Sequence, residues 1–249
     1  MKAVFIMIVA AMAVGMGLFF VWGALFRKDA PRQPASHRPE PKAMEGGDDM
    51  IRLTPPRLKG IVSVEEAIKA RRSRREFSDK SLTLAELSQV CWAAQGITKG
   101  YLRAAPSAGA LYPLELYVIV GKDGVKGLGE GVYHYLPQEH SLRLHAPKDR
   151  RMSLAMAALG QTFIARAPVS LVITAQYSRT TGKYGARGRR YVHMEVGHVG
   201  ENIHLQAEAL HMATVVIGAF SDAAVVKALN LPAAHEPLAI MPVGYPKRE

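Results

Sequence analysis

Pro106-Ser107-Ala108-Gly109-Ala110-Leu111-Tyr112-Pro113-Leu114-Glu115-Leu116-Tyr117-Val118-Ile119-Val120 is the stretch that decides the fold of this chain. Small side chains around Gly109 let backbone N–H and C=O groups approach a flat or extended ligand. Pro113 fixes the exit from this loop, and residues 114–120 have the β-branched and aromatic content of a buried strand. The pattern predicts a ligand-binding loop that leads into a core strand, although an ordinary tight loop before a strand has the same pattern.

The composition limits the classes of protein to consider. With 249 residues, 49% of them hydrophobic, the chain can form one or two domains with a sizeable core. Its net charge of +11 favours an anionic partner: nucleic acid, a phospholipid surface or a phosphorylated small molecule. The single cysteine, Cys91, excludes an internal disulfide framework, and its apolar neighbours predict a buried thiol.

The N-terminal 60 residues differ in composition from the rest. Residues 3–26 carry no charge, and as a helix they would extend about 36 Å, enough to span a bilayer. This predicts an uncleaved single-pass membrane anchor over residues 1–26, with a cleavable signal peptide as the alternative. Cations after this run favour a cytoplasmic folded domain, with a signal-anchor of the opposite topology as the alternative. Residues 27–60 are rich in proline and charge, which predicts a basic tether before a folded domain over residues 61–249.

A basic cluster follows the first predicted helix of this domain. Ser63 and Glu66 have the spacing of a capping box, and a helix is expected over residues 64–72. The helix leads into Arg71-Arg72-Ser73-Arg74-Arg75, whose guanidinium groups and hydroxyl match the oxygen atoms of a phosphate. A solvated basic helix end and a nucleic-acid contact are the alternatives.

Hydrophobic periodicity and turn residues predict the remaining elements. They are helices over 84–95, 153–163, 192–211 and 222–229, strands over 169–175, 214–217 and 238–243, a hairpin over 131–136 and 141–145, and a basic loop over 182–191. The long helix contains three Glu-x-x-His pairs that begin at Glu195, Glu201 and Glu208. Because these pairs turn away from one another around the helix, we expect no metal site and favour ordinary electrostatic pairs.

Several motifs in a fixed order resemble the nitroreductase family of FMN-dependent flavoproteins, most closely its azoline-dehydrogenase-like (SagB-type) branch. The markers are Arg71-Arg72-Ser73-x-Arg75-x-Phe77, Trp92-Ala93-Ala94-Gln95-Gly96, Pro106 to Glu115, Gly197-His198-Val199-Gly200-x-Asn202, Ile217-Gly218-Ala219-Phe220 and Val243-Gly244-Tyr245-Pro246. The resemblance covers residues 61–246. It implies an α+β fold with a central mixed or antiparallel sheet flanked by helices, and a homodimer with FMN at the subunit interface.

The resemblance also implies which residues bind FMN, and these agree with the phosphate cluster and the glycine loop found above. They are Arg71, Arg72, Ser73 and Arg75 at the phosphate, with Lys247 or Arg248 as helpers, Pro106, Ser107, Ala108, Gly109 and Ala110 along the ribityl chain and ring, and Gly218 and Ala219 on the other side of the isoalloxazine. A cofactor phosphate gives the net charge a role other than nucleic-acid binding, and no nucleic-acid partner is expected.

The expected activity follows from the flavin, which exchanges hydride at N5 with a small organic or peptide-derived substrate. Lys183-Tyr184-Gly185-Ala186-Arg187-Gly188 fits the branch's pattern for a pair that assists proton removal. Lys183 is therefore predicted as the base and Tyr184 as its partner, with a loop that only gates the pocket as the alternative. NADH or NADPH is a candidate electron donor. The competing function is a non-catalytic, membrane-anchored protein that binds anions or nucleic acid through its arginine clusters.

Overall fold

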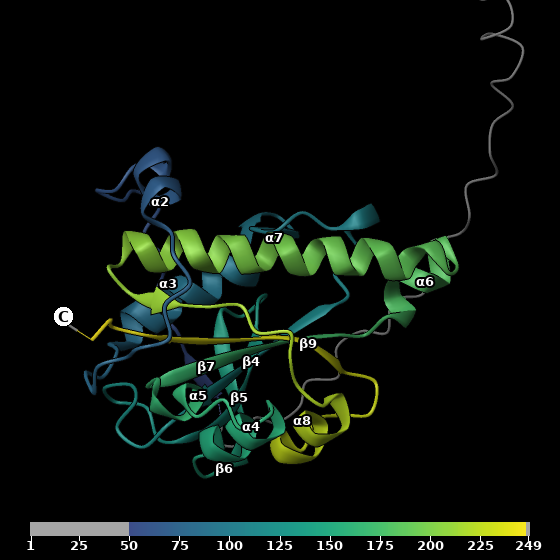
Figure 1. The fold of residues 1–249 in the computed structure, drawn as a ribbon. Coiled ribbons are helices and arrows are strands. Elements are labelled where there is room, and N and C mark those ends of the chain that lie inside the picture. Colours follow the sequence, from purple (N-terminus) through teal and green to yellow (C-terminus); the bar gives the residue numbers. More distant parts are fainter. Residues whose placement is uncertain (1–49, 248–249) are drawn as a thin grey trace, which may run out of the picture. The chain divides into compact units, whose positions relative to one another are not determined.

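The computed structural model describes residues 50–247, which contain a seven-stranded sheet between two layers of helices (Figure 1). Its strand order is β1-β6-β5-β4-β7-β9-β8, and all neighbouring strands pair antiparallel. The strands are β1 (Met50–Arg52), β4 (Leu114–Val120), β5 (Gly131–Leu136), β6 (Ser141–Pro147), β7 (Val169–Ala175), β8 (Ala213–Thr214) and β9 (Glu236–Gly244). A separate hairpin joins β2 (Ile97–Lys99) and β3 (Leu102–Arg103). The α+β fold with an antiparallel sheet is therefore confirmed.

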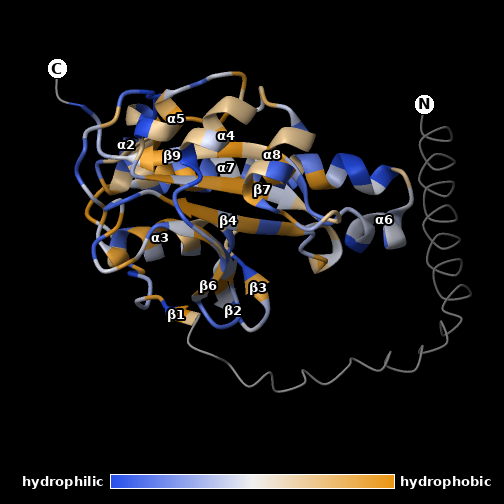
Figure 2. Ribbon diagram, turned by 90° about the horizontal axis from the view of Figure 1, so that it is seen from below, coloured by the Kyte–Doolittle hydropathy of each residue, from blue (hydrophilic) through white to orange (hydrophobic). Residues whose placement is uncertain are grey.

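The predicted core strand β4 lies at the centre of the sheet, where β5 and β7 pair with its two edges. Leu114, Leu116 and Val118 belong to one buried cluster, whereas Tyr117 and Ile119 belong to a second cluster. Successive side chains of a strand point to opposite faces, so each face of β4 carries its own core. Figure 2 shows the central strands β4, β7 and β9 as mostly hydrophobic.

The helices cover both faces of the sheet (Figure 1). One layer holds α3 (Leu84–Gln95) and α7 (Arg187–Ala209), with α2 (Val64–Ala70) and α6 (Ser178–Tyr184) packed against α7, and the other holds α4 (Arg151–Ala157), α5 (Phe163–Arg166) and α8 (Asp222–Leu229). The capping box predicted at Ser63 is present, since Ser63 Oγ accepts the Glu66 N–H at 3.1 Å, and a second capping box starts α3, where Thr83 Oγ1 accepts the Glu86 N–H at 3.2 Å. Cys91 is buried in the layer of α3, and burial raises the pKa of its thiol.

Three segments differ from the prediction for identifiable reasons. The helix expected over 153–163 is interrupted between α4 and α5, because Leu159 and Gly160 adopt positive φ values of 59° and 76°. Of the strand expected over 214–217, only Thr214 belongs to β8, and Ile217 forms an isolated bridge to Ile240 of β9. The basic loop expected over 182–191 is helical, with one break at Gly185 between α6 and α7.

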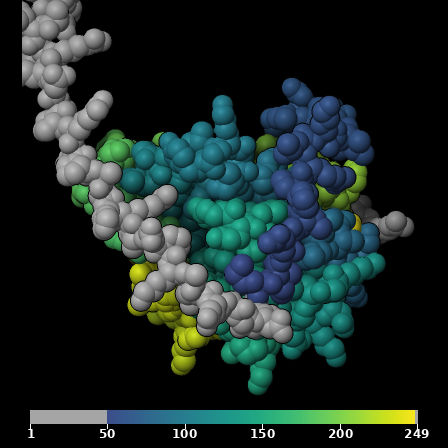
Figure 3. Space-filling model, turned by 180° about the vertical axis from the view of Figure 1, so that it is seen from behind, coloured from purple at the N-terminus to yellow at the C-terminus, as the bar shows by residue number. Residues whose placement is uncertain are grey.

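The first described residues belong to the fold, although the predicted tether extended to residue 60. β1 pairs with β6, and Leu53 is buried in the core. The Leu53 N–H donates to the His140 carbonyl at 3.0 Å. In Figure 3 the purple and blue segment that follows β1 lies against teal residues of the same domain.

The prediction of a single-pass membrane location requires correction. Within residues 50–247, no helix is both long and apolar enough to cross a bilayer. The longest, α7, has 23 residues but carries charged side chains, including Arg189, Glu201 and Glu208. Residues 3–26, on which the prediction rested, lie outside the described residues, and the membrane location is not retained.

Candidate functional site

The loop before β4 has an unusual backbone that its neighbours hold in place. Gly109, Ala110 and Tyr112 all adopt positive φ, at 62°, 52° and 47°. Left-handed conformations of alanine and tyrosine are unfavourable and persist only where surrounding contacts impose them. Here Ser107 Oγ accepts the Tyr112 N–H at 2.9 Å, and the Tyr112 hydroxyl accepts the Arg103 N–H at 3.1 Å. The loop is therefore a rigid and strained structure, as binding sites often are.

A buried carboxylate supports this loop from α7. Glu195 is 4% exposed, and its Oε1 atom accepts the backbone N–H of Ala108 at 3.0 Å. Burial raises the pKa of Glu195, whereas the hydrogen bonds from Ala108 and Ser107 oppose this effect. In the sequence, Glu195 stands out only as part of a Glu-x-x-His pair, because the contact with a loop 87 residues away in the chain leaves no local pattern.

The predicted catalytic pair meets the same loop. A methyl group at Gly109 would lie 2.7 Å from the Tyr184 hydroxyl and 3.0 Å from Lys183 Nζ. Both side chains therefore reach the one position of the loop where glycine leaves room for them. Lys183 Nζ lies 5.4 Å from the centre of the Tyr184 ring, which packs edge-on against Tyr191 of α7 at 5.2 Å. The structure thus brings Lys183 and Tyr184 to a glycine that lies more than 70 positions earlier in the sequence.

Arg179 connects α6 to both the loop and the sheet. Its guanidinium donates to the Tyr112 carbonyl at 2.9 Å and pairs with the Glu115 carboxylate at 2.5 Å. Glu115 also contacts His134 Nε2 at 2.8 Å. Burial alone would raise the pKa of the Glu115 carboxyl, but the His134 hydrogen bond and the Arg179 charge hold this pKa below its ordinary value. The sequence gives no signal for the role of Arg179, since this role depends on where α6 packs.

The arginine cluster occupies the opposite end of α7. Ser73 bridges to Thr214 of β8, and Arg74 forms an ion pair with Glu208 near the end of α7. Arg72 donates to the carbonyl groups of Lys69 and Arg71, at 2.9 and 2.8 Å. Arg75 is exposed, so it is free to bind an anion, whereas Arg74 has a structural partner.

The C-terminal segment lies beside the residues that follow this cluster. The Lys247 N–H donates to the Glu76 carbonyl at 3.2 Å, which places Lys247 beside the residues that follow Arg75. Arg248 lies outside the described residues. Gly218 and Ala219 are exposed, with open space around the Gly218 Cα, but no hydrogen bond or ion pair within residues 50–247 joins them to the loop or to the cluster. Within the described residues, α7 therefore contacts two of the three predicted FMN-binding groups, the arginine cluster and the loop 106–110.

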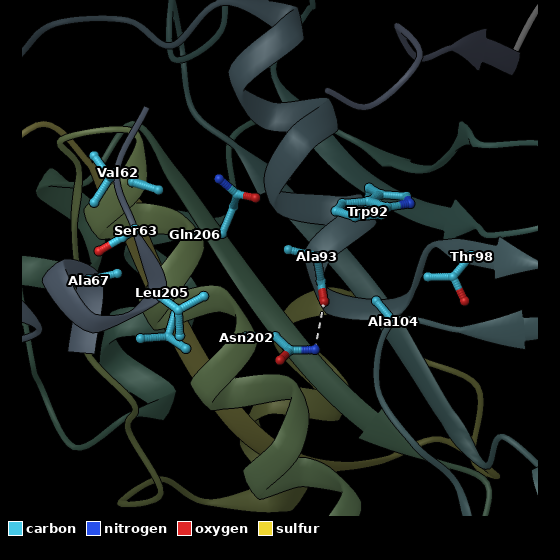
Figure 4. A pocket seen from close by; sticks show the side chains of 12 residues that line it. Val62, Ser63, Ala67, Trp92, Ala93, Thr98, Ala104, Asn202, Leu205 and Gln206 are labelled. Atoms are coloured by element: carbon cyan, nitrogen blue, oxygen red, sulfur yellow. Dashed lines mark hydrogen bonds between the residues drawn. The ribbon is translucent and has the colours of Figure 1, made fainter. Parts of the chain in front are cut away.

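A groove lies between α2, α3 and α7 (Figure 4). Asn202 crosses its floor, where Nδ2 donates to the Ala93 carbonyl at 3.0 Å. Ser63, Trp92 and Leu205 line its sides. Apolar side chains beside the groove are unusually exposed: Ile61 at 93%, Val64 at 63% and Ile68 at 57%. Such a surface is typical of an interface with another polypeptide.

Comparisons with known proteins identify this architecture. The sequence model of the nitroreductase family matches residues 68–245. The nitroreductase-family protein MJ1384 of Methanocaldococcus jannaschii is 48% identical over 185 residues, which are 74% of this chain and 91% of that protein. The crystal structure of a nitroreductase-family protein from Ralstonia eutropha superimposes with a TM-score of 0.70 at 26% identity, over 81% of this chain and 91% of the other.

A more distant relative is named for the processing of microcin B17. The microcin B17-processing protein McbC of Escherichia coli is 29% identical over 132 residues, which cover 52% of this chain and 48% of McbC. Together with the family match, this similarity agrees with the predicted position of the chain near the azoline-dehydrogenase-like branch. The family match also supports the predicted enzyme over the non-catalytic binding protein.

Proposed function

Because the chain belongs to the nitroreductase family and is an oxidoreductase, we propose that it uses FMN to transfer hydride to or from a small organic or peptide-derived substrate. The observation that carries this proposal is the convergence of Lys183 and Tyr184 on Gly109. Bound FMN would supply a hydride donor and acceptor at its N5 atom. The similarity to McbC supports a peptide-derived substrate, and NADH or NADPH is the proposed source of electrons.

The described residues fit an FMN cofactor at two places. Arg71, Arg72, Ser73 and Arg75, with Lys247 beside them, offer guanidinium, hydroxyl and ammonium donors to a phosphate. The loop 106–110 offers a glycine and small side chains where a flat ring can approach the backbone. We assign Gly218 and Ala219 to the other side of the isoalloxazine ring. The FMN that they contact would be bound either to their own subunit or to the partner subunit. The exposed apolar surface around α2 supports a homodimer.

The proposed chemistry assigns the proton to the side chains of α6. Lys183 would take a proton from the substrate during oxidation and return one during reduction, and the Tyr184 hydroxyl would orient the same group. The Arg179 contacts with Tyr112 and Glu115 hold α6 against the loop, so that both groups keep their positions.

The proposal is tested on the full chain by its absorption spectrum after incubation with FMN and removal of free cofactor. We expect flavin bands in the visible range, and anaerobic addition of NADH or NADPH reports whether either reduces the flavin. Lys183→Ala should keep FMN and lose about 10²- to 10⁴-fold in the rate of substrate turnover, the usual contribution of a positioned acid or base. A chain that takes up no FMN would refute the cofactor, and full turnover by Lys183→Ala would refute the base.

A further inference from the structure

The segment from α6 into the first turns of α7 carries an excess of positive charge beside the proposed catalytic pair. Residues 178–193 contain five cations and no acid. Two of the five have partners from other elements: Arg179 pairs with Glu115, and Arg189 lies 3.5 Å from Glu236. Lys183, Arg187 and Arg190 are exposed and have no acidic partner within residues 50–247. Unpaired cations next to a reaction site attract anionic ligands.

The spacing along α7 places one of these cations near the loop. Arg187, Tyr191 and Glu195 follow one another at intervals of four residues, which puts them on adjoining turns of one side of the helix. Glu195 contacts the loop through Ala108, and Tyr191 packs against Tyr184. Arg187 is the next residue along this row, and its guanidinium lies 6.0 Å from the centre of the Tyr191 ring.

The neighbouring acid does not neutralise Arg187. The Glu195 carboxyl is buried beneath the loop and accepts the Ala108 N–H, so its hydrogen-bonding capacity is directed at the backbone. Arg187, in contrast, is exposed and lies two turns away towards the N-terminus of α7. Its guanidinium presents a planar set of donors that matches a carboxylate or phosphate.

We propose that the substrate carries an anionic group, a carboxylate or a phosphate, and that Arg187 binds this group while Lys183 and Tyr184 act on the reacting atoms. The inference rests on the proposed function, because it places the substrate beside that pair. Lys183 cannot serve as the permanent anchor, since a residue that exchanges a proton changes its charge during turnover. With Arg187 as the anchor, one residue binds the anionic group and another, Lys183, transfers the proton.

The test compares two probes of nearly equal shape, 4-nitrobenzoate and the neutral 4-nitrobenzamide. Their dissociation constants for the FMN-loaded full chain are measured by ligand-observed NMR, at low and at high NaCl. We expect tighter binding of the benzoate, weakened by salt because exposed charges are screened. Arg187→Gln should weaken benzoate binding about fivefold, the upper value for one exposed ion pair, and leave benzamide binding within about twofold.

Two variants serve as controls. Lys126→Gln removes one exposed cation from the loop beyond the far end of β4, and it should leave both dissociation constants unchanged. Arg187→Lys keeps the charge and should recover part of the affinity for benzoate. Equal binding of the two probes, or equal effects of Arg187→Gln and Lys126→Gln, would overturn the inference while FMN uptake still supported the proposed function. Failure to take up FMN would refute the proposed function itself.

Discussion

Replacing Gly109 with alanine tests the geometry of the site most directly. The new methyl group would lie 2.7 Å from the Tyr184 hydroxyl, about 0.7 Å inside an ordinary contact of 3.4 Å, and 3.0 Å from Lys183 Nζ. Both side-chain ends must then move away from the loop. Displacing a reacting group by about 1 Å can cost about 100-fold in rate, so we expect Gly109→Ala to lose turnover on that scale.

The same substitution also has a backbone cost that must be separated from the contact. Gly109 has a φ of 62°, and alanine in this region costs about 1–2 kcal/mol of stability. Gly127 provides the matched control, because its φ is 78° and no atom lies within 4 Å of the added methyl group. Gly127→Ala should therefore lose similar stability and keep full turnover.

Two measurements distinguish these effects. Urea unfolding at equilibrium gives the free energy of unfolding of each variant. Anaerobic mixing of the dithionite-reduced, FMN-loaded variants with 4-nitrobenzamide gives the rate of flavin reoxidation in a stopped-flow instrument. If Gly109→Ala reoxidised its flavin at the wild-type rate, the placement of Lys183 and Tyr184 against the loop would be refuted. Equal losses in the two variants would attribute the effect to backbone strain alone.

The remaining predictions concern the charges around the site. Glu115→Gln should lower the free energy of unfolding by about 2 kcal/mol at pH 7. Because the pKa of Glu115 is depressed in the folded state, the difference between wild type and variant should shrink as pH falls below about 4.5. Urea titrations at pH 7 and pH 4 measure this change. Glu195→Ala, which removes the acceptor of the Ala108 N–H, should cost about 1–3 kcal/mol in thermal or urea unfolding, whereas Glu195→Gln should cost less. Arg75→Gln should weaken FMN binding about tenfold in a fluorescence titration with little loss of stability, whereas Arg74→Gln should mainly destabilise the chain, since it breaks the pair with Glu208; the reverse ranking would contradict the assignment of the cluster.

The parts of the fold that the sequence predicts well are those with local signals. Both capping boxes, at Ser63 and Thr83, mark helix starts that the structure reproduces. The apolar composition of residues 114–120 marks the central strand, and the alternation of residues 131–145 marks the hairpin of β5 and β6. In each case the interactions that define the element lie within a few residues, so a short window of sequence contains them.

The start of the long helix shows where local signals are insufficient. The glycines at 182, 185 and 188 and the dense cations predict a flexible loop, yet residues 178–184 and 187–209 are helical. Tertiary contacts overrule propensity here: Thr180 is buried, Gly188 packs against the backbone of Thr181, and Arg179 is held by Glu115. A side chain at Gly188 would come within 2.9 Å of that backbone, so this glycine permits close helix packing rather than flexibility.

The same distinction applies to the candidate site. Lys183 and Tyr184 could be proposed from their sequence pattern, but their meeting with Gly109 depends on where α6 packs. Glu195 and Arg179 have no recognisable motif, because each acts on backbone atoms of a loop far away in the chain. Their importance follows from what the loop lacks: its positive-φ residues cannot hold their conformation alone, and it needs donors and acceptors supplied from outside.

This dependence makes α6 the connection between the sheet, the strained loop and the proposed chemistry. Arg179 and Lys183 are four residues apart on a helix of seven residues, so a displacement of one end is passed to the other within about one turn. Loss of the Arg179 ion pair should therefore reduce turnover more than it reduces FMN binding, because the arginine cluster lies at the other end of α7. If Arg179→Gln lowered turnover and FMN affinity equally, α6 would support the cofactor rather than the proton-transfer pair.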